Sequence, residues 1–353
     1  MSRLEPYLPV LVALIALVGF VTLASAAPDP SYVTRQAAWF VAGVVGCVAI
    51  FWIGGQRIDK LTLPLYALTL VLLVVVLIFG EEINGAKRWL EFGPARVQPS
   101  ELAKVALILL LGRYLSLPSA RGPLSYLLVG AVVGVPFVLV LAGPDLGSAL
   151  VIGAIGAAML FVRGVPTRLL VGVAVLAVVA VPLVVPNLAP HQQARITTFL
   201  NPEADPQGAG YQVMQARIAI GSGGLTGKGW RQGTQTQLDF IPFKHTDFIF
   251  PVLAEELGFV GSAFILGLFA LLFYRLAVMA MECPRPRDQL VISGVLAYLG
   301  FQTLVNVGVS LGLAPVTGLT LPIVSYGGTN LVITLAVLGL AMLVHRDRFR
   351  GFS

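Results

Sequence analysis

Charged residues are scarce in this chain. They make up 11% of its 353 residues, whereas hydrophobic residues make up 57%. A soluble domain typically carries about 25% charged residues. A chain this poor in charge cannot cover a globular surface with polar groups, so lipid must solvate much of it. The scarcity excludes an ordinary soluble protein.

Cysteine and histidine are scarcer still. Cys47 lies in an apolar run and Cys283 precedes a proline, so the two cysteines offer neither a disulfide framework nor a metal-binding spacing. His191, His245 and His345 are also far apart in the sequence, which argues against a zinc site. The net charge of +6 does not indicate nucleic-acid binding, because the basic residues lie in short loops between apolar runs.

Long apolar runs fill most of the chain. A membrane helix needs about 20 apolar residues, and this criterion predicts ten spans, over residues 7–26, 36–55, 61–79, 101–117, 124–142, 146–162, 168–186, 248–274, 289–311 and 329–344. The first run ends in Ala24-Ser25-Ala26 like a signal peptide, but it exceeds the about 7–15 residues of a signal core, so we predict a retained helix. We therefore expect an all-α polytopic membrane protein with a single transmembrane domain over residues 1–353.

Basic residues predict the orientation. With the N-terminus in the cytoplasm, most lysines and arginines fall in cytoplasmic segments, and the short outer loops hold only Arg35, Lys87, Arg88 and Arg96. This asymmetry follows the positive-inside rule and places both termini in the cytoplasm. Two longer connections then face outward: residues 81–100, and the long extracytoplasmic loop 187–247 between spans seven and eight. Within the long loop, residues 211–220 predict a short helix on the membrane surface.

The first outer loop gathers basic and aromatic residues, namely Lys87, Arg88, Trp89 and Arg96. Because Pro99 disfavours helix at the residue before it, we expect the next helix to start with Ser100 as its N-cap. Lys104 then lies about one turn inside, close to Glu101. These residues fit a cationic pocket for a phosphate-bearing lipid headgroup. They fit equally a capped helix with an ion pair and an interfacial tryptophan.

Acidic residues mark a second candidate site. Asp247 opens the eighth span, where a carboxylate can also serve as a helix cap. Glu255 and Glu256 lie about two turns inside, where an unpaired carboxylate is costly and usually functional. At helical spacing, Glu255 falls nearer the Asp247 face than Glu256 does. Asp145, between the fifth and sixth spans, is expected mainly to cap the next helix.

The motifs together resemble a known family. Residues 306–330 read N-x5-G-L-x-P-x-x-G-L-x-x-P-x-x-S-Y-G-G-T-N, which resembles the signature of the shape, elongation, division and sporulation (SEDS) family. Matches at residues 84–89, 98–101, 144–147, 245–248 and 255–258 extend the resemblance over nearly the whole chain. Short termini make it more similar to the RodA branch than to the FtsW branch.

The resemblance implies a ten-helix peptidoglycan glycosyltransferase that polymerises lipid II at the outer face of the bacterial cytoplasmic (inner) membrane, for elongation and cell shape. It also implies a class B penicillin-binding protein as cross-linking partner within the elongation complex. The family's essential aspartate falls on Asp247, its other important polar positions on Arg96, Lys104 and Asp239, and its loop aromatic on Trp89.

A mechanism follows from the residues and the resemblance together. Asp247 would act as general base on a sugar hydroxyl that attacks a glycan carried on undecaprenyl pyrophosphate. Cations at Arg96, Lys104, Lys87 and Arg88 would neutralise the pyrophosphate. A divalent cation, Mg or Mn, held by Asp247 or Asp239 is a further option. The other candidate substrate-binding residues are Trp89, Glu101, Asp145, Glu255 and Ser325.

Two alternatives belong to other functional classes. A lipid II flippase would place its decisive charges near the bilayer midplane and show two related halves, but no internal repeat is evident and the charge cluster lies at the outer edge. A non-catalytic scaffold for the penicillin-binding protein needs only apolar helix faces and small residues, which leaves Asp247, Glu255 and Lys104 without a role.

Overall fold

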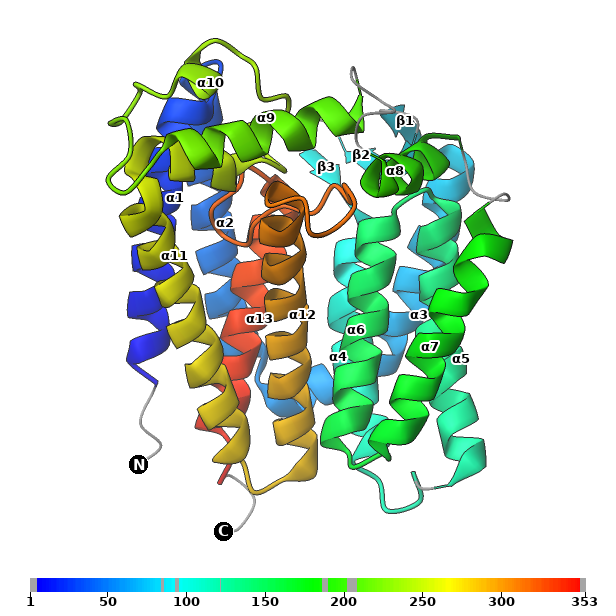
Figure 1. The fold of residues 1–353 in the computed structure, drawn as a ribbon. Coiled ribbons are helices and arrows are strands. Elements are labelled where there is room, and N and C mark those ends of the chain that lie inside the picture. The colour runs from blue at the N-terminus through cyan, green and yellow to red at the C-terminus, as the bar shows by residue number, and fades with distance from the viewer. Residues whose placement is uncertain are drawn as a thin grey trace.

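Long helices run side by side through the molecule (Figure 1), and the described part of the chain contains ten of them. The computed structural model describes residues 5–83, 86–92, 95–120, 122–185, 190–201 and 208–349. The long helices are α1 (Tyr7–Ala26), α2 (Ser31–Ile53), α3 (Gly55–Phe79), α4 (Pro99–Leu115), α5 (Pro123–Ala142), α6 (Leu146–Val162), α7 (Thr167–Val184), α11 (Ile249–Met281), α12 (Pro286–Ser310) and α13 (Gly328–Arg346). Each occupies one of the ten predicted spans, which confirms the fold class.

Three helix ends extend at least five residues beyond the predicted apolar runs. Helix α2 begins at Ser31 rather than at residue 36, α3 begins at Gly55 rather than at 61, and α11 continues to Met281 rather than stopping at 274. The apolar criterion detects only the part of a helix that lies in hydrocarbon. Backbone hydrogen bonding continues into the interface, where polar side chains are tolerated.

A second layer covers one end of the bundle (Figure 1). It consists of α8 (Pro190–Leu200), α9 (Ala209–Ser222), the single turn α10 (Thr234–Gln237), and an antiparallel sheet of β1 (Glu81–Ile83), β2 (Ala86–Phe92) and β3 (Ala95–Val97) in the order β1-β2-β3. Helix α9 lies across the bundle end, which confirms the surface helix predicted at 211–220. The sheet, α8 and α10 were not predicted.

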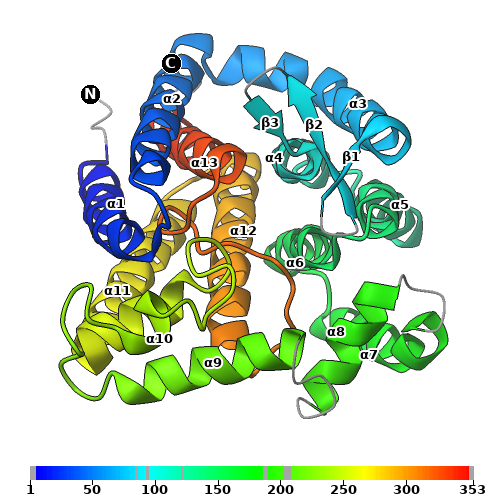
Figure 2. The ribbon, with the colours of Figure 1, turned by 90° about the horizontal axis from the view of Figure 1, so that it is seen from above.

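Helix α12 lies well inside the bundle when it is seen from above (Figure 2), and it packs against α4, α6, α11 and α13. Helices α2 and α13 pack more extensively than any other pair in the part of the chain that the structure describes. At Gly43, an added Cβ would lie 2.5 Å from the Leu335 side chain, and at Gly339 it would lie 2.5 Å from Cys47 Sγ. Small residues at these points allow the close approach, as is common between membrane helices.

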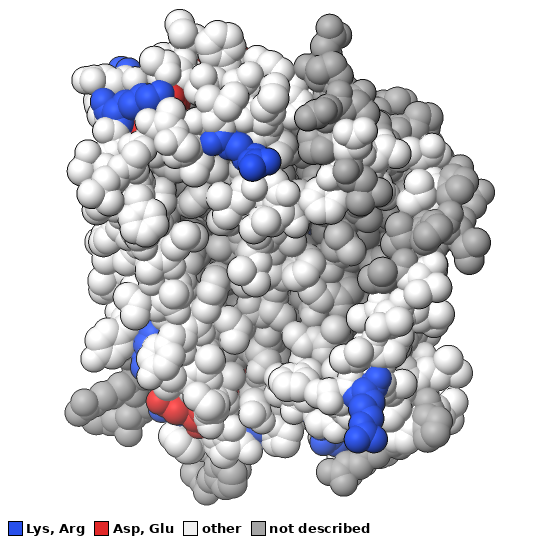
Figure 3. Space-filling view, viewed as in Figure 1, with Lys and Arg blue, Asp and Glu red and all other residues white. Residues whose placement is uncertain are grey.

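Charged side chains lie toward the two ends of the face shown in Figure 3, and an uncharged belt separates them. Such a belt is what a bilayer requires of a spanning protein. Helix α1 begins, and α13 ends, at the end of the bundle opposite α9 (Figure 1). The chain is therefore a multi-pass membrane protein in which α1 begins and α13 ends on the same side of the membrane.

Candidate active site

The turn before α11 carries Asp247, and hydrogen bonds from side chains to its backbone carbonyls hold this turn in place. Asn306 Nδ2 donates to the Asp247 carbonyl over 2.8 Å and to the Leu319 carbonyl over 2.7 Å. Ser325 Oγ donates to the Thr246 carbonyl over 2.6 Å. Both donors come from the 306–330 signature, so the signature positions Asp247 through its main chain.

Two arginines approach the Asp247 carboxylate from separate elements. A Cβ placed on Gly318 would lie 3.7 Å from Asp247 Oδ2, 3.8 Å from Arg88 Nη1 and 4.0 Å from Arg195 Nη1. Arg88 belongs to β2, Arg195 to α8, and Gly318 to the loop between α12 and α13. A small volume is thus bounded by one carboxylate and two guanidiniums, and the glycine keeps it open.

Asp145 completes the charge balance of this volume. Arg88 Nη1 lies 3.9 Å from Asp145 Oδ1, and Asp145 also accepts hydrogen bonds from the Ser148 amide over 3.1 Å and from Gln98 Nε2 over 2.8 Å. The bond from Ser148 confirms Asp145 as the N-cap of α6. Arg88 Nε is buried without a hydrogen-bond partner among the described residues, which leaves a donor for a substrate anion.

Burial and the neighbouring charges shift the pKa values of two of these groups, Asp247 and Arg195. Burial raises the pKa of Asp247 above its ordinary value, while the positive charges of Arg88 and Arg195 oppose the rise. Burial and the neighbouring Arg88 lower the pKa of Arg195. A carboxylate with a raised pKa binds a proton more strongly, so Asp247 is a better general base than an exposed aspartate.

Lys104 and Glu101 pair as predicted, but deep inside the protein. The Lys104 ammonium lies 2.7 Å from Glu101 Oε1, and Lys104 is 0% exposed. Tyr298 and Asn330 donate to the other Glu101 oxygen over 3.0 and 3.3 Å. In this conformation the Lys104 ammonium is closed to solvent, and its contact with pyrophosphate stays a prediction.

The prediction of Ser100 as N-cap is wrong, and the alternative that Asp247 caps α11 does not hold either. Helix α4 begins at Pro99, with Gln98 at the N-cap position, rather than after Ser100. A proline fits the first turn because its missing N–H would have had no helical partner. Helix α11 begins after Phe248, whose side chain makes no cap hydrogen bond, so Asp247 lies outside the helix and does not cap it.

The argument that helical spacing brings Glu255 nearer than Glu256 to the Asp247 face does not apply, because Asp247 lies outside the helix. Glu255 instead binds the segment before Asp247: it accepts from Lys228 Nζ over 2.8 Å, from the Gln235 amide over 2.9 Å and from the Thr236 amide over 3.0 Å. Glu256 accepts from Ser25 Oγ over 2.5 Å. These two carboxylates therefore bind α11 to the outer loop, including α10, and to α1.

The remaining candidates have other partners or surroundings. Arg96 pairs with Glu91 over 2.5 Å on the exposed edge of the sheet. Asp239 pairs with Lys244 over 2.6 Å, and its side chain is 80% exposed. Trp89 is partly buried in β2. The side chain of Lys87 falls outside the described residues.

A divalent cation does not fit the carboxylates predicted to hold it. Among the described residues, no group of three aspartate, glutamate, histidine or cysteine side chains comes together. Asp247 shares its volume with two arginines, and Asp239 is paired with a lysine. Each of these two carboxylates thus has a positively charged side chain beside it, which disfavours a further cation there.

Arg195 and Gly318 are site residues that the sequence reasoning missed. Arg195 lies in a polar stretch of the long loop, and no local pattern links it to Asp247. Gly318 stands inside the signature and has a φ of +75°, a conformation that favours glycine. The one sequence signal for Gly318 was its place inside the signature, between two prolines.

Known proteins resemble this chain over most of its length. A family model described as cell cycle protein, for FtsW, RodA and SpoVE, matches residues 7–349. The peptidoglycan glycosyltransferase MrdB of Escherichia coli is 39% identical over 350 residues, which cover 98% of this chain and 94% of MrdB. A probable peptidoglycan glycosyltransferase FtsW of Thiomicrospira cyclica is 41% identical over 285 residues, covering 79% of this chain and 73% of that protein.

Solved structures share the whole architecture. One, described as the structural coordination of polymerization and crosslinking by a peptidoglycan synthase complex, matches with a TM-score of 0.88 at 43% identity, covering 99% of this chain and 100% of the matched chain. The rod shape determining protein RodA of Thermus thermophilus matches with a TM-score of 0.77 at 40% identity, covering 99% and 98%.

Proposed function

The chain belongs to the FtsW, RodA and SpoVE family of cell cycle proteins, and on this premise we propose that it is a peptidoglycan glycosyltransferase that polymerises lipid II at the outer face of a bacterial cytoplasmic membrane. The observation that carries the proposal is the meeting of Asp247, Arg88 and Arg195 around Gly318. It supplies a base beside two cations at one end of the bundle, where a membrane-anchored headgroup is within reach.

Asp247 acts as general base in the proposed reaction. Its carboxylate takes the proton from a sugar hydroxyl of the acceptor lipid II, and the hydroxyl oxygen forms a bond to the anomeric carbon of the donor glycan. The bond from that carbon to the donor's pyrophosphate oxygen breaks, and its electron pair leaves with the undecaprenyl pyrophosphate. The leaving group gains negative charge rather than a need for a proton, so no second carboxylic acid is required.

Arg88 and Arg195 stabilise the departing pyrophosphate. Guanidiniums bind phosphate oxygens with two parallel hydrogen bonds, and the unpaired Arg88 Nε is one donor for this purpose. Fixed cations aimed at developing charge lower the barrier without reorganisation. Arg88 was among the predicted pyrophosphate ligands, and Arg195 joins it in this role. The contacts of Arg96 and Lys104 with pyrophosphate stay predictions.

A cross-linking partner is part of the proposal. One matched structure is described as a complex that coordinates polymerization and crosslinking, which supports a class B penicillin-binding protein as partner in an elongation complex. A flippase is the weaker proposal, since Arg88 belongs to β2, Arg195 to α8 and Asp247 to the turn before α11. These elements lie at the covered end of the bundle and not at the middle of the helices (Figure 1).

The test is polymer formation from labelled lipid II by purified protein, alone and with its partner. Asp247→Asn keeps the side-chain size and removes the proton acceptor, so the rate should fall by about 10² or more. Asp29→Asn is the matched control, because Asp29 is an exposed aspartate that accepts from the Ser31 amide. Full polymerisation by a folded Asp247→Asn protein would remove Asp247 from the mechanism.

A further inference from the structure

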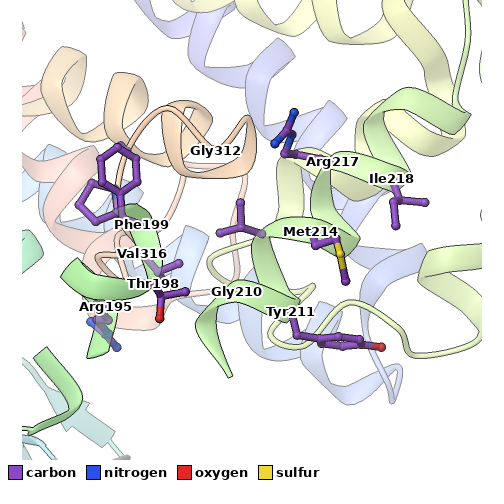
Figure 4. A pocket seen from close by; sticks show the side chains of 13 residues that line it. Arg195, Thr198, Phe199, Gly210, Tyr211, Met214, Arg217, Ile218, Gly312 and Val316 are labelled. Carbon is purple, nitrogen blue, oxygen red and sulfur yellow. The ribbon is translucent and has the colours of Figure 1, made fainter. Parts of the chain in front are cut away.

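A groove of about 670 Å³ lies between α8, α9 and the loop that follows α12. Its walls include Phe199 of α8, Met214 and Ile218 of α9, and Val316 of the loop, with Arg195 and Arg217 also contributing (Figure 4). Phe199, Met214 and Ile218 are 38%, 49% and 44% exposed. The volume is that of a small-molecule site, and its apolar lining suits a hydrocarbon chain.

The groove borders the Asp247 volume at Arg195. Arg195 both lines the groove and reaches to 4.0 Å from the Gly318 Cβ position, beside Asp247. The loop connects the same two places, because its residues 312 and 314–316 line the groove and Gly318 lies two residues further on. The opposite face of α9 is anchored through Ala216 and Ala219 to Phe248, next to Asp247. The polar end of a ligand whose apolar part lies in the groove can therefore meet Arg195, beside Asp247.

We propose that this groove binds the polyprenyl chain of the donor substrate, the glycan carried on undecaprenyl pyrophosphate. The inference rests on the proposed function and decides which of the two lipid-linked substrates the groove serves. The apolar groove with the Arg195 guanidinium beside it is complementary to a polyprenyl pyrophosphate. The hydrocarbon chain packs on apolar side chains, and the phosphate binds the cation.

Geometry assigns the groove to the donor. A general base lies within about 3 Å of the hydroxyl oxygen, which lies about 3–3.5 Å from the anomeric carbon. The donor's pyrophosphate is bonded directly to that carbon, so it must lie close to Asp247. The acceptor's pyrophosphate is two sugar rings away from its reacting hydroxyl. Arg88 and Arg195, which share one small volume with Asp247, are thus placed for the donor, and the chain attached to that pyrophosphate runs past Arg195 into the groove.

The test separates the two substrates chemically. A donor-only lipid II analogue lacks the reacting hydroxyl, and an acceptor-only analogue carries a non-cleavable methylene phosphonate at the anomeric carbon, so one coupling occurs per pair. The double variant Met214→Gln, Ile218→Gln makes the groove polar with two exposed substitutions. The control Leu225→Gln alters an exposed leucine that does not line the groove and is 68% exposed.

We expect the double variant to raise KM for the donor-only analogue by about tenfold or more, with little change in kcat, from the loss of apolar contact. KM for the acceptor-only analogue should not change, and a donor with a two-isoprene chain should not distinguish the variant from the unmodified protein. A raised KM for the acceptor instead, or no change in either KM, overturns the assignment. No coupling by the unmodified protein would remove the proposed function itself, and this proposal with it.

Discussion

Gly318 offers a sharp test of the active-site geometry. In Gly318→Ala, the new methyl would lie 3.7 Å from Asp247 Oδ2, 3.8 Å from Arg88 Nη1 and 4.0 Å from Arg195 Nη1. These are ordinary van der Waals distances, so the methyl fits without a clash in the free protein. It nevertheless occupies the point where a substrate oxygen or phosphate would have to contact all three groups.

Backbone strain must be separated from this effect. The φ of Gly318 is +75°, and a left-handed conformation costs an alanine about 1–2 kcal/mol. Gly164 has a φ of +89° and no atom within 4 Å of its Cβ position, so Gly164→Ala carries similar strain in open space on the other side of the bundle. The two variants should therefore lose similar amounts of thermal stability in detergent.

Activity should distinguish the two variants. Displacing the substrate by about 1 Å can cost about 10² in rate, so we expect Gly318→Ala to polymerise labelled lipid II at least about tenfold more slowly than Gly164→Ala. Rates are compared at a temperature where both proteins are fully folded. Equal rates in the two variants would show that no substrate group enters the volume between Asp247 and the arginines, and the proposed mechanism would lose its geometric basis.

Two further predictions concern charge. Activity should fall as the pH drops through the pKa of Asp247. Because burial raises this pKa, the fall should occur above the ordinary aspartate value of about 4. Arg88→Gln removes a charge that lowers the pKa of Asp247, so it should move the fall to higher pH in a pH–rate profile. The native state binds this proton more tightly than the unfolded chain does, so the contribution of Asp247 to stability declines as the pH rises through its folded pKa. Lys104→Met leaves Glu101 buried without its cation and should lower the free energy of unfolding by about 3–5 kcal/mol, whereas adding Glu101→Leu should restore part of it; equal melting temperatures for Lys104→Met and the unmodified protein would contradict the pairing.

The membrane helices were predictable because the apolar length of a span is a local property. The range 7–26 was predicted and observed for α1, and 146–162 was predicted and observed for α6. The pairing of Glu101 with Lys104 was predictable for the same reason, since residues three apart are neighbours on a helix. Their burial was not, because it depends on Tyr298 and Asn330, which come from helices far away in the chain.

The outer layer was largely unpredictable. The strands β1 and β3 have three residues each, too short to show an alternating pattern, and their pairing depends on the partner strand. Arg195 reaches Asp247 only because α8 folds back over the bundle end (Figure 1). The face argument for Glu255 failed for a related reason: it extended the helix to Asp247, whereas α11 begins two residues later.

The 306–330 signature is most informative about the family, yet it contributes few side chains to the chemistry. Asn306 and Ser325 bind the backbone of residues 246–247, and the Tyr326 amide donates to the His245 carbonyl over 2.9 Å. Gly318 contributes the absence of a side chain. The signature therefore acts as a cradle that fixes the main chain around Asp247. With its main chain fixed in this way and a side-chain hydrogen bond from Thr246, the Asp247 carboxylate is held beside the two arginines, in position to meet the sugar hydroxyl.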